Sequence, residues 1–166
     1  MKAVVIGAGI TGVTTAYFLS QNNIDVTLVE SRRYPAMATS YANGGQLSAS
    51  NAEAWNSWNN VKTGLKSFFS NSHSSVIMNP SPSISKIMWF LRFIQNIKNS
   101  DNITHDICKM AISSIKFYDA IAKKENLKFD KLDKGIIHLY MDKRHTENAE
   151  YINTIYRKAG LNRFRI

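Results

Sequence analysis

A glycine-rich turn that follows a short apolar strand constrains this chain more than any other feature. Residues 2–6 read Lys-Ala-Val-Val-Ile, a run typical of a buried parallel strand. The chain continues as Gly7-Ala8-Gly9-Ile10-Thr11-Gly12, with the spacing G-x-G-x-x-G. The first glycine allows a tight turn, the second lets a diphosphate approach the backbone, and the third lets a helix pack closely on the strand. This spacing predicts a dinucleotide-binding turn.

The residues after the turn predict the rest of a β-α-β unit. A helix is expected from about Ile10 to Gln21, and Asn22-Asn23 favours its end because Asn tolerates the left-handed conformation. The residues expected to lie on the sheet repeat at helical spacing and are Val13, Ala16, Tyr17 and Ser20. Residues 25–29 predict the second strand, with Glu30 at its carboxyl end. Glu30 follows Gly12 by 18 residues, close to the ~20 expected for an acidic residue that binds a ribose.

The nature of the dinucleotide is only partly fixed by these residues. The carboxylate of Glu30 would repel a 2′-phosphate, so NADP is disfavoured despite the neighbouring Arg32 and Arg33. FAD and NAD both remain compatible with the spacing. The simpler alternative is a glycine-rich turn in an α/β domain that binds no nucleotide.

A second motif carries a resemblance to a known family. Residues 39–48 read Thr-Ser-Tyr-Ala-Asn-Gly-Gly-Gln-Leu-Ser. Together with the glycine turn, this segment resembles the flavin-dependent D-amino-acid dehydrogenase small-subunit family, among the D-amino-acid oxidase-like flavoproteins. In that family a loop of the type T-S-x-A-N-[GA]-G-Q-[IL]-S lies along the flavin. The alternative is a surface turn in which Asn43-Gly44-Gly45 only supplies positive φ angles.

The resemblance implies an α/β fold. It consists of a Rossmann-like FAD-binding β-α-β unit with a helical cover, followed by the beginning of an antiparallel substrate domain. The expected domains are residues 1–83, the FAD-binding region, and residues 84–166, a helical segment with part of the substrate domain. Members of the family are far longer, so we expect a truncated, N-terminal portion of such an enzyme. The residues expected to contact FAD are Val5, Ile6, Gly7, Ala8, Gly9, Ile10, Thr11, Gly12, Glu30, Ser40, Asn43, Gly44, Gly45 and Gln46.

The same resemblance implies an activity. A D-amino acid would be oxidised to an imino acid, which water hydrolyses to a 2-oxo acid and ammonia, and electrons would pass to an acceptor other than oxygen. Because the flavin carries the redox step, no catalytic side chain is predicted in this chain. Two alternatives stay open: a non-catalytic remnant of such an enzyme, and an NAD-binding module. The expected partners are a D-amino acid, a second polypeptide that supplies the C-terminal part, and a membrane surface.

Composition limits other kinds of site. The single cysteine, Cys108, cannot form an internal disulfide, which favours a reducing compartment. We therefore expect a cytoplasmic protein, with peripheral attachment to the inner face of the membrane as the alternative. The four histidines lack metal-binding spacing, so no metal is expected. The net charge of +9 suits anionic ligands, but no nucleic-acid motif accompanies it, and no nucleic-acid partner is expected.

Helical periodicity dominates the second half of the chain. Residues 49–83 predict one or two short helices and loops. A helix over Ile84–Ile97 is expected to pack on a domain core, with a membrane surface as the alternative. A second helix is expected to run from its N-cap, Asp101, to about Glu125, and a third from Lys143 to Ala159, ending at Gly160.

The sequence between the last two helices predicts strands. Leu127 and Phe129, then Ile137 and Leu139, alternate as expected for a pair of strands joined near residues 133–135. Residues 163–166 alternate like the beginning of a further strand.

Overall fold

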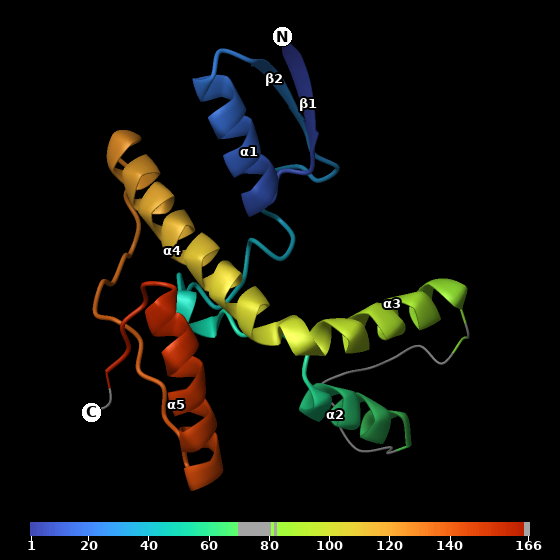
Figure 1. The fold of residues 1–166 in the computed structure, drawn as a ribbon. Helices are drawn as coiled ribbons and strands as arrows, with labels where there is room; N and C mark the ends of the chain where they lie inside the picture. The colour runs from blue at the N-terminus through green and yellow to red at the C-terminus, as the bar shows by residue number, and fades with distance from the viewer. Residues whose placement is uncertain (70–80, 82, 165–166) are drawn as a thin grey trace. The chain divides into compact units, whose positions relative to one another are not determined.

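The computed structural model describes residues 1–69, 81 and 83–164. These residues divide between two compact units, Met1–Gln46 and Leu47–Ile166. The predicted domain boundary between residues 83 and 84 applies to the longer enzymes that the chain resembles, and it stays a prediction. The elements follow the order β1 (Lys2–Ile6), α1 (Ile10–Gln21), β2 (Asp25–Val29), η1 (Ala49–Asn51), α2 (Trp58–Phe69), α3 (Ile84–Gln95), η2 (Asn96–Asn99), α4 (Ser100–Lys124) and α5 (Lys143–Lys158) (Figure 1).

The first unit is a β-α-β motif with a parallel two-stranded sheet. β1 pairs with β2 in the register that places Lys2 opposite Asp25 and Ile6 opposite Val29. The Gly7 N–H donates to the Val29 carbonyl at 2.7 Å, which continues the pairing one residue past β1. Both strands and α1 therefore occupy the predicted residues, and the β-α-β prediction is confirmed.

The helix α1 ends where the sequence predicted. Asn22 caps the helix, and Asn23 takes a φ of 59°, in the left-handed region that Asn tolerates. The predicted sheet-facing residues are partly wrong, because Val13 and Ser20 are exposed whereas Ala16 and Tyr17 are half-buried. On the sheet side α1 presents a glycine, since a Cβ on Gly12 would lie 1.8 Å from the Gly7 carbonyl oxygen and 3.6 Å from a Val5 methyl group.

The core of the second unit lies between η1, α4 and α5. Its buried members are small apart from one tyrosine, and they are Ala49, Ala52, Cys108, Tyr156 and Ala159. The buried Tyr156 hydroxyl donates to the Ser50 carbonyl at 3.2 Å, and burial raises the pKa of Tyr156 to about 12. The buried Thr104 hydroxyl accepts the Ala54 N–H at 3.0 Å, which ties the chain after η1 to α4. One hydrogen bond thus ties η1 to α5, and the other ties the chain after η1 to α4.

The helices of this unit match the predicted pattern with one change at a cap. Two short helices, η1 and α2, precede residue 70, and residues 70–80 and 82 lie outside the described residues. α4 begins at Ser100 with Asn99 as its N-cap, so the prediction that Asp101 is the cap is wrong. Asp101 lies in the first turn, where its charge suits the positive end of the helix. Its carboxylate also accepts a hydrogen bond from the Tyr151 hydroxyl of α5.

The last helix, α5, begins at the predicted Lys143 and ends at Lys158, one residue before the predicted end, whereas its N-cap, Asp142, was not predicted. The Asp142 carboxylate caps α5 by accepting the His145 N–H at 2.8 Å, and this hydrogen bond lowers the pKa of Asp142. Gly160 follows the end of α5 with a φ of 94°, a value that a side chain would strain. The predicted glycine stop is confirmed.

The strand pair predicted from Leu127–Phe129 and Ile137–Leu139 is wrong. Among the described residues, β1 and β2 are the strands that the structure contains, and the chain between α4 and α5 is irregular. An isolated two-stranded ribbon is marginal unless its apolar face is covered, and Ile137 and Leu139 are 74% and 83% exposed. Arg163 and Phe164 form no strand either, while residues 165–166 lie outside the described chain.

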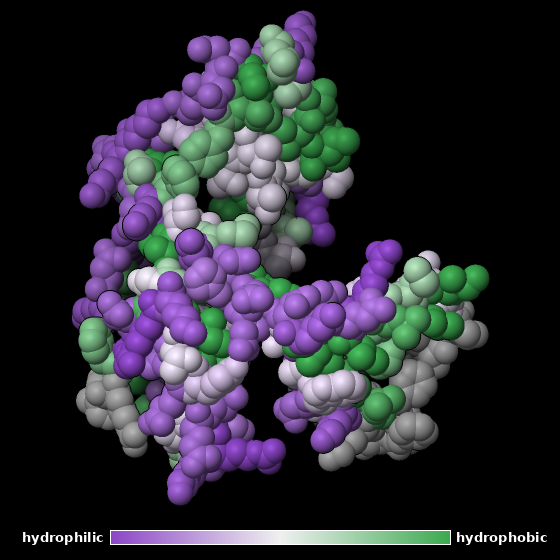
Figure 2. All heavy atoms as spheres, viewed as in Figure 1, coloured by the Kyte–Doolittle hydropathy of each residue, from purple (hydrophilic) through white to green (hydrophobic). Residues whose placement is uncertain are grey.

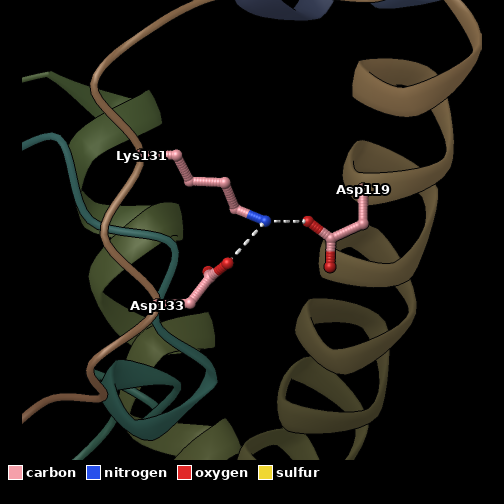
Figure 3. A network of polar contacts seen from close by, with 3 residues as sticks. All are labelled: Asp119, Lys131 and Asp133. Atoms are coloured by element: carbon pink, nitrogen blue, oxygen red, sulfur yellow. Dashed lines mark hydrogen bonds and ion pairs between the residues drawn. The ribbon is translucent and has the colours of Figure 1, made fainter.

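An ion-pair network holds this irregular segment to α4. The Lys131 ammonium lies 2.7 Å from a carboxylate oxygen of Asp119, on α4, and 3.2 Å from one of Asp133 (Figure 3). The two carboxylates raise the pKa of Lys131. All three side chains reach solvent, so the network positions the segment more than it stabilises the fold.

We predict that Thr104→Val destabilises the chain by about 1–3 kcal/mol, because the nearly isosteric side chain removes the acceptor of the Ala54 N–H. The measurement is the free energy of unfolding in urea. Thr154→Val is the matched control, since this exposed threonine lies on α5 and only donates to the Tyr151 carbonyl. We expect a change within about 0.5 kcal/mol for the control, and equal losses in both variants would contradict the role of Thr104.

Candidate dinucleotide site

The glycine turn joins β1 to α1 through a tight backbone path. Gly7 has a φ of 94°, a conformation that L side chains rarely adopt. Ala8 is completely buried, and Gly9 is the N-cap of α1 with extended backbone. The turn therefore directs the N-terminus of α1, whose first N–H groups have no partner within the helix and which is the positive end of the dipole, toward the carboxyl ends of the strands.

The third glycine is required by packing. A Cβ on Gly12 would lie 1.8 Å from the carbonyl oxygen of Gly7 and 3.6 Å from a methyl group of Val5. The first value is far below any real contact, and the atom in question belongs to the backbone. The close approach of helix and strand predicted from G-x-G-x-x-G is thus visible as a specific contact between Gly12 and Gly7.

The carboxylate of Glu30 lies at the turn. One oxygen accepts the Ala8 N–H at 2.6 Å, and the other accepts the Arg32 N–H at 2.9 Å. The Ser31 hydroxyl donates to this second oxygen at 3.2 Å. These hydrogen bonds, that from Ala8 first, lower the pKa of Glu30, so the group is an anion at neutral pH. The structure therefore sets a fixed negative acceptor at the end of β2, beside the turn.

Ser40 reaches the same place from farther along the chain. Its hydroxyl oxygen accepts the Ile10 N–H, the first amide of α1, at 3.0 Å. A Cβ on Gly9 would lie 3.3 Å from that oxygen, so the glycine leaves room for the serine at the helix end. The Ser40 hydroxyl oxygen therefore lies at the N-terminus of α1, the kind of position at which helices bind phosphate oxygens.

Two residues that the sequence analysis did not nominate shape the loop between Glu30 and Ser40. The Ala36 N–H donates to the Ala8 carbonyl at 2.9 Å, and the Arg32 guanidinium donates to the Met37 carbonyl at 2.7 Å. Ala36 takes a φ of 61°, a left-handed conformation that the sequence at this position does not predict. Arg32 was considered only for its charge beside a 2′-phosphate. Its contact with a carbonyl five residues ahead follows from the loop's conformation.

The remaining predicted residues divide into those at the turn and those in the following loop. Val5 is half-buried below the turn, Ile6 is exposed, and Thr11 is exposed in the first turn of α1. In the loop, the Gly45 N–H donates to the Asn43 side-chain oxygen at 2.7 Å, and Gly45 has a φ of 60°. Gly44 and Gln46 are exposed. The structure thus brings Glu30 and Ser40 to the glycine turn. The hydrogen bond between Gly45 and Asn43, in contrast, joins two residues of the same loop.

The residues at the turn fit an adenosine diphosphate group. The backbone N–H groups of the first turn of α1 can meet phosphate oxygens, and glycines at positions 7 and 9 keep side chains away from that approach. The anionic Glu30 can accept hydrogen bonds from two ribose hydroxyls. Donors for an anion and an acceptor for a sugar therefore lie next to each other on one surface.

Other chemistry finds little support in the described chain. Within residues 1–69, 81 and 83–164, no group of three or more His, Cys, Asp or Glu residues is arranged to hold a metal ion. Cys108 is fully buried, and burial raises the pKa of its thiol, which disfavours the nucleophilic thiolate. None of the described helices has both the length and the apolar composition that crossing a membrane requires.

We predict that Gly12→Ala destabilises the first unit by about 1–3 kcal/mol, because the new methyl group must displace the Gly7 backbone. Urea unfolding measures the change. Gly64→Ala, on α2, is the control, since its Cβ would meet nothing within 4 Å. In a helix interior this control is expected to stabilise by about 0.5–1 kcal/mol. A neutral Gly12→Ala variant would show that the contact is not constrained.

The lowered pKa of Glu30 predicts a pH dependence of stability. Because the folded pKa is lower than the unfolded one, the stabilisation is complete above the ordinary Glu pKa of about 4.3 and is lost as pH falls through the folded value. Thermal unfolding of the parent and of Glu30→Gln should therefore differ most near neutral pH and converge in acid. Asp25→Asn, at the opposite end of β2, controls for the loss of one carboxylate. A difference that persists in strong acid would contradict this role of the Glu30 charge.

Comparisons with known proteins agree with this geometry. The family model described as "DAO: FAD dependent oxidoreductase" matches residues 2–165. D-amino acid dehydrogenase 3 of Mesorhizobium japonicum is 46% identical over 162 residues, which cover 98% of this chain and 39% of the relative. D-amino acid dehydrogenase of Dechloromonas aromatica is 30% identical over 166 residues, with 98% and 39% covered. That of Neisseria meningitidis is 28% identical over 163 residues, with 97% and 39% covered.

These matches decide between the cofactors that the glycine turn left open. No solved structure matches the chain. The chain spans about 39% of the length of the curated relatives named above. The matched family is FAD-dependent, which confirms the flavin prediction over an NAD-binding module, and a Rossmann-like α/β fold accompanies it. A match over nearly all of its residues identifies the chain as a member of the FAD-dependent oxidoreductase family.

Proposed function

We propose that the unit Met1–Gln46 binds the adenosine diphosphate half of FAD, and that the chain is the N-terminal portion of a D-amino-acid dehydrogenase. The observation that carries this proposal is the Glu30 carboxylate, anchored 2.6 Å from the Ala8 amide beside the N-terminus of α1. An anion in that position suits the hydroxyl groups of a ribose and opposes a 2′-phosphate.

Each part of the turn has a role in this proposal. The amides at the start of α1 receive the diphosphate, and the Ile10 N–H that now donates to Ser40 becomes available to a phosphate oxygen. The Ser40 hydroxyl can then donate to the same phosphate. Val5, Ile6 and Thr11 border the nucleotide, and the loop of Asn43, Gly44, Gly45 and Gln46 approaches the flavin half.

The reaction follows from the family and the names of the relatives. When bound, FAD supplies the electron acceptor for oxidation of a D-amino acid to an imino acid, which water hydrolyses to a 2-oxo acid and ammonia. The relatives named D-amino acid dehydrogenase support this substrate class and an electron acceptor other than oxygen. We assign no catalytic side chain in residues 1–166. In this chain the protein groups hold the nucleotide and keep side chains clear of the diphosphate.

The rest of the proposed enzyme corresponds to the remaining length of the relatives. We propose that residues 1–83 form part of the FAD domain and that residues 84–166 begin an antiparallel substrate domain. A later region of the same chain or a second polypeptide would complete that domain. The proposed location is the cytoplasm, with peripheral attachment to the inner face of the membrane.

A non-catalytic remnant of such an enzyme is the second candidate, since no catalytic side chain is assigned in residues 1–166. Such a protein retains the nucleotide turn but turns over no substrate. Reduction of a dye that depends on D-alanine separates the two candidates. Turnover by FAD-loaded protein supports the enzyme, whereas flavin binding without turnover supports the remnant.

We predict that the chain binds FAD and ADP but not FMN, because the fitted group is the adenosine diphosphate half. Glu30→Gln should weaken FAD and ADP binding about tenfold to a hundredfold, since the hydrogen bonds lost involve a charged acceptor. Isothermal titration calorimetry measures both ligands. Asp25→Asn is the matched control and should bind as the parent does.

Two results would contradict the proposal. One is a folded chain that gives no heat with either FAD or ADP. The other is equal weakening by Glu30→Gln and Asp25→Asn, which would indicate a general effect of charge on the unit.

A further inference from the structure

A series of side-chain hydrogen bonds begins at the end of the loop motif, residues 39–48, which we call the flavin loop. Ser48 is its last residue. The Ser48 and Ser50 hydroxyl oxygens lie 2.8 Å apart, and the Ser50 hydroxyl oxygen lies 2.8 Å from Nε2 of His138. Ser50 and His138 are 88 residues apart in the sequence. These three side chains, which we call the loop anchor, therefore tie the end of the flavin loop to the irregular segment between α4 and α5.

The backbone of Ser50 is held as well as its side chain. Its carbonyl accepts the hydrogen bond from the Tyr156 hydroxyl at 3.2 Å, and Ala49 beside it is buried. Tyr156 is 1% exposed although it belongs to α5, whose side chains on the face in view are mainly hydrophilic (Figure 2). Ser50 is therefore fixed by a core residue, and it gives the loop anchor a rigid middle.

The imidazole of His138 is positioned by its own neighbours. Its ring stacks on that of Tyr140, with the centroids 6.5 Å apart and the planes 11° from parallel. The Tyr140 hydroxyl accepts a hydrogen bond from the Arg163 guanidinium at 2.8 Å. That guanidinium lies 5.6 Å from the centre of the Tyr156 ring. His138 is thus connected to the same tyrosine of α5 that holds Ser50.

We propose that His138 is a positioning residue for the flavin: through Ser50 and Ser48 it fixes the C-terminal end of the flavin loop. Ordering a flexible segment costs free energy, so a loop whose end is already held binds a ligand more tightly. All members of the loop anchor belong to Leu47–Ile166, so their hydrogen bonds form within one unit. The inference rests on the proposed function for one point, that the flavin loop contacts the flavin.

The loop anchor depends on the protonation of His138. Burial, together with the charge of Arg163, lowers the pKa of His138, so its imidazole is neutral at neutral pH. The other titratable groups of the cluster are Tyr140, Tyr156 and Glu53, which acts on Tyr156. Because the folded pKa lies below the ordinary value of about 6.5, the anchor is complete above that value. It weakens as pH falls through the folded pKa, since a cationic imidazole is repelled by Arg163.

The first test follows the NMR signals of a ¹⁵N-labelled chain without added ligand, from about pH 7.5 to about pH 5. We expect the amides of residues 43–50 to shift with the same midpoint as the His138 ring, below the ordinary value of about 6.5. Ser50→Ala should leave the His138 titration in place but uncouple the amides of residues 43–47 from it. Ser114→Ala, which removes an exposed hydroxyl from α4, is the matched control and should keep the coupling.

The second test measures FAD binding by calorimetry. His138→Phe and Ser50→Ala should each weaken binding about threefold to tenfold at neutral pH, the effect of one lost hydrogen bond. His138→Gln retains a group that can hydrogen-bond to Ser50, so it should bind within about twofold of the parent at neutral pH. Unlike the parent, this variant should not bind more weakly in mild acid. His145→Phe removes an exposed histidine of α5 and should behave as the parent does.

Two results would overturn this role of His138. One is a His138 titration that leaves the amides of residues 43–47 unchanged. The other is FAD binding by Ser50→Ala and His138→Phe that equals the binding of His145→Phe. If His138→Phe does not fold, Ser50→Ala provides the comparison. A parent chain that does not bind FAD would contradict the proposed function instead, and the titration of the ligand-free chain would still decide whether His138 fixes the flavin loop.

Discussion

The hydrogen bond from the Ala8 amide to the Glu30 carboxylate joins the two strand ends on which the first unit depends. Ala8 follows β1 and Glu30 follows β2, and they are bonded at 2.6 Å across 22 residues of chain. The Gly7 N–H donates to the Val29 carbonyl one step below, so the strand pairing passes directly into the turn. The same carboxylate that closes the motif also gives it an acceptor for a sugar. The Glu30 side chain therefore both stabilises the motif and provides the proposed acceptor for the sugar.

The close contact of Gly12 with Gly7 determines where the helix dipole points. Because no side chain separates α1 from the turn, the first amides of the helix lie beside the Glu30 carboxylate. Positive and negative groups then stand next to each other in an order that matches a diphosphate followed by a ribose. The Ser40 oxygen on the Ile10 amide shows that this helix end already accepts an oxygen ligand.

Local signals account for what the sequence could predict. The β-branched run, the three glycines and the Asn pair each act on a few neighbouring residues, and β1, α1 and β2 begin and end where they indicate. Gly160 ended α5 for the same reason. Glu30 was found from its distance to Gly12, and Ser40 from the resemblance of its loop to a flavoprotein family. The contact of Ser40 with Ile10, across 30 residues, has no signature in spacing alone.

The predicted strand pair was wrong because its alternating apolar residues have no further strand or helix to pack on. Leu127, Phe129, Ile137 and Leu139 have the pattern of a ribbon, but a ribbon gains stability from a third strand or a covering helix. Asp101 is a good capping residue in isolation, yet Asn99 two residues earlier took that position. The conformation of Ala36 follows from its bond to the Ala8 carbonyl, a contact that depends on the folded turn. The ribbon and the conformation of Ala36 depend on contacts between distant parts of the chain, which a short-range pattern does not contain.

Amide chemical shifts in a ¹⁵N-labelled chain titrated with ADP test the central claim most directly. The account predicts that the largest changes fall on residues 8–12 and 30–32, with the Ala8 and Ile10 amides most affected. Their current partners are the Glu30 carboxylate and the Ser40 hydroxyl, which the nucleotide would engage. Shifts confined to other residues, or a folded chain whose spectrum ADP leaves unchanged, would contradict it.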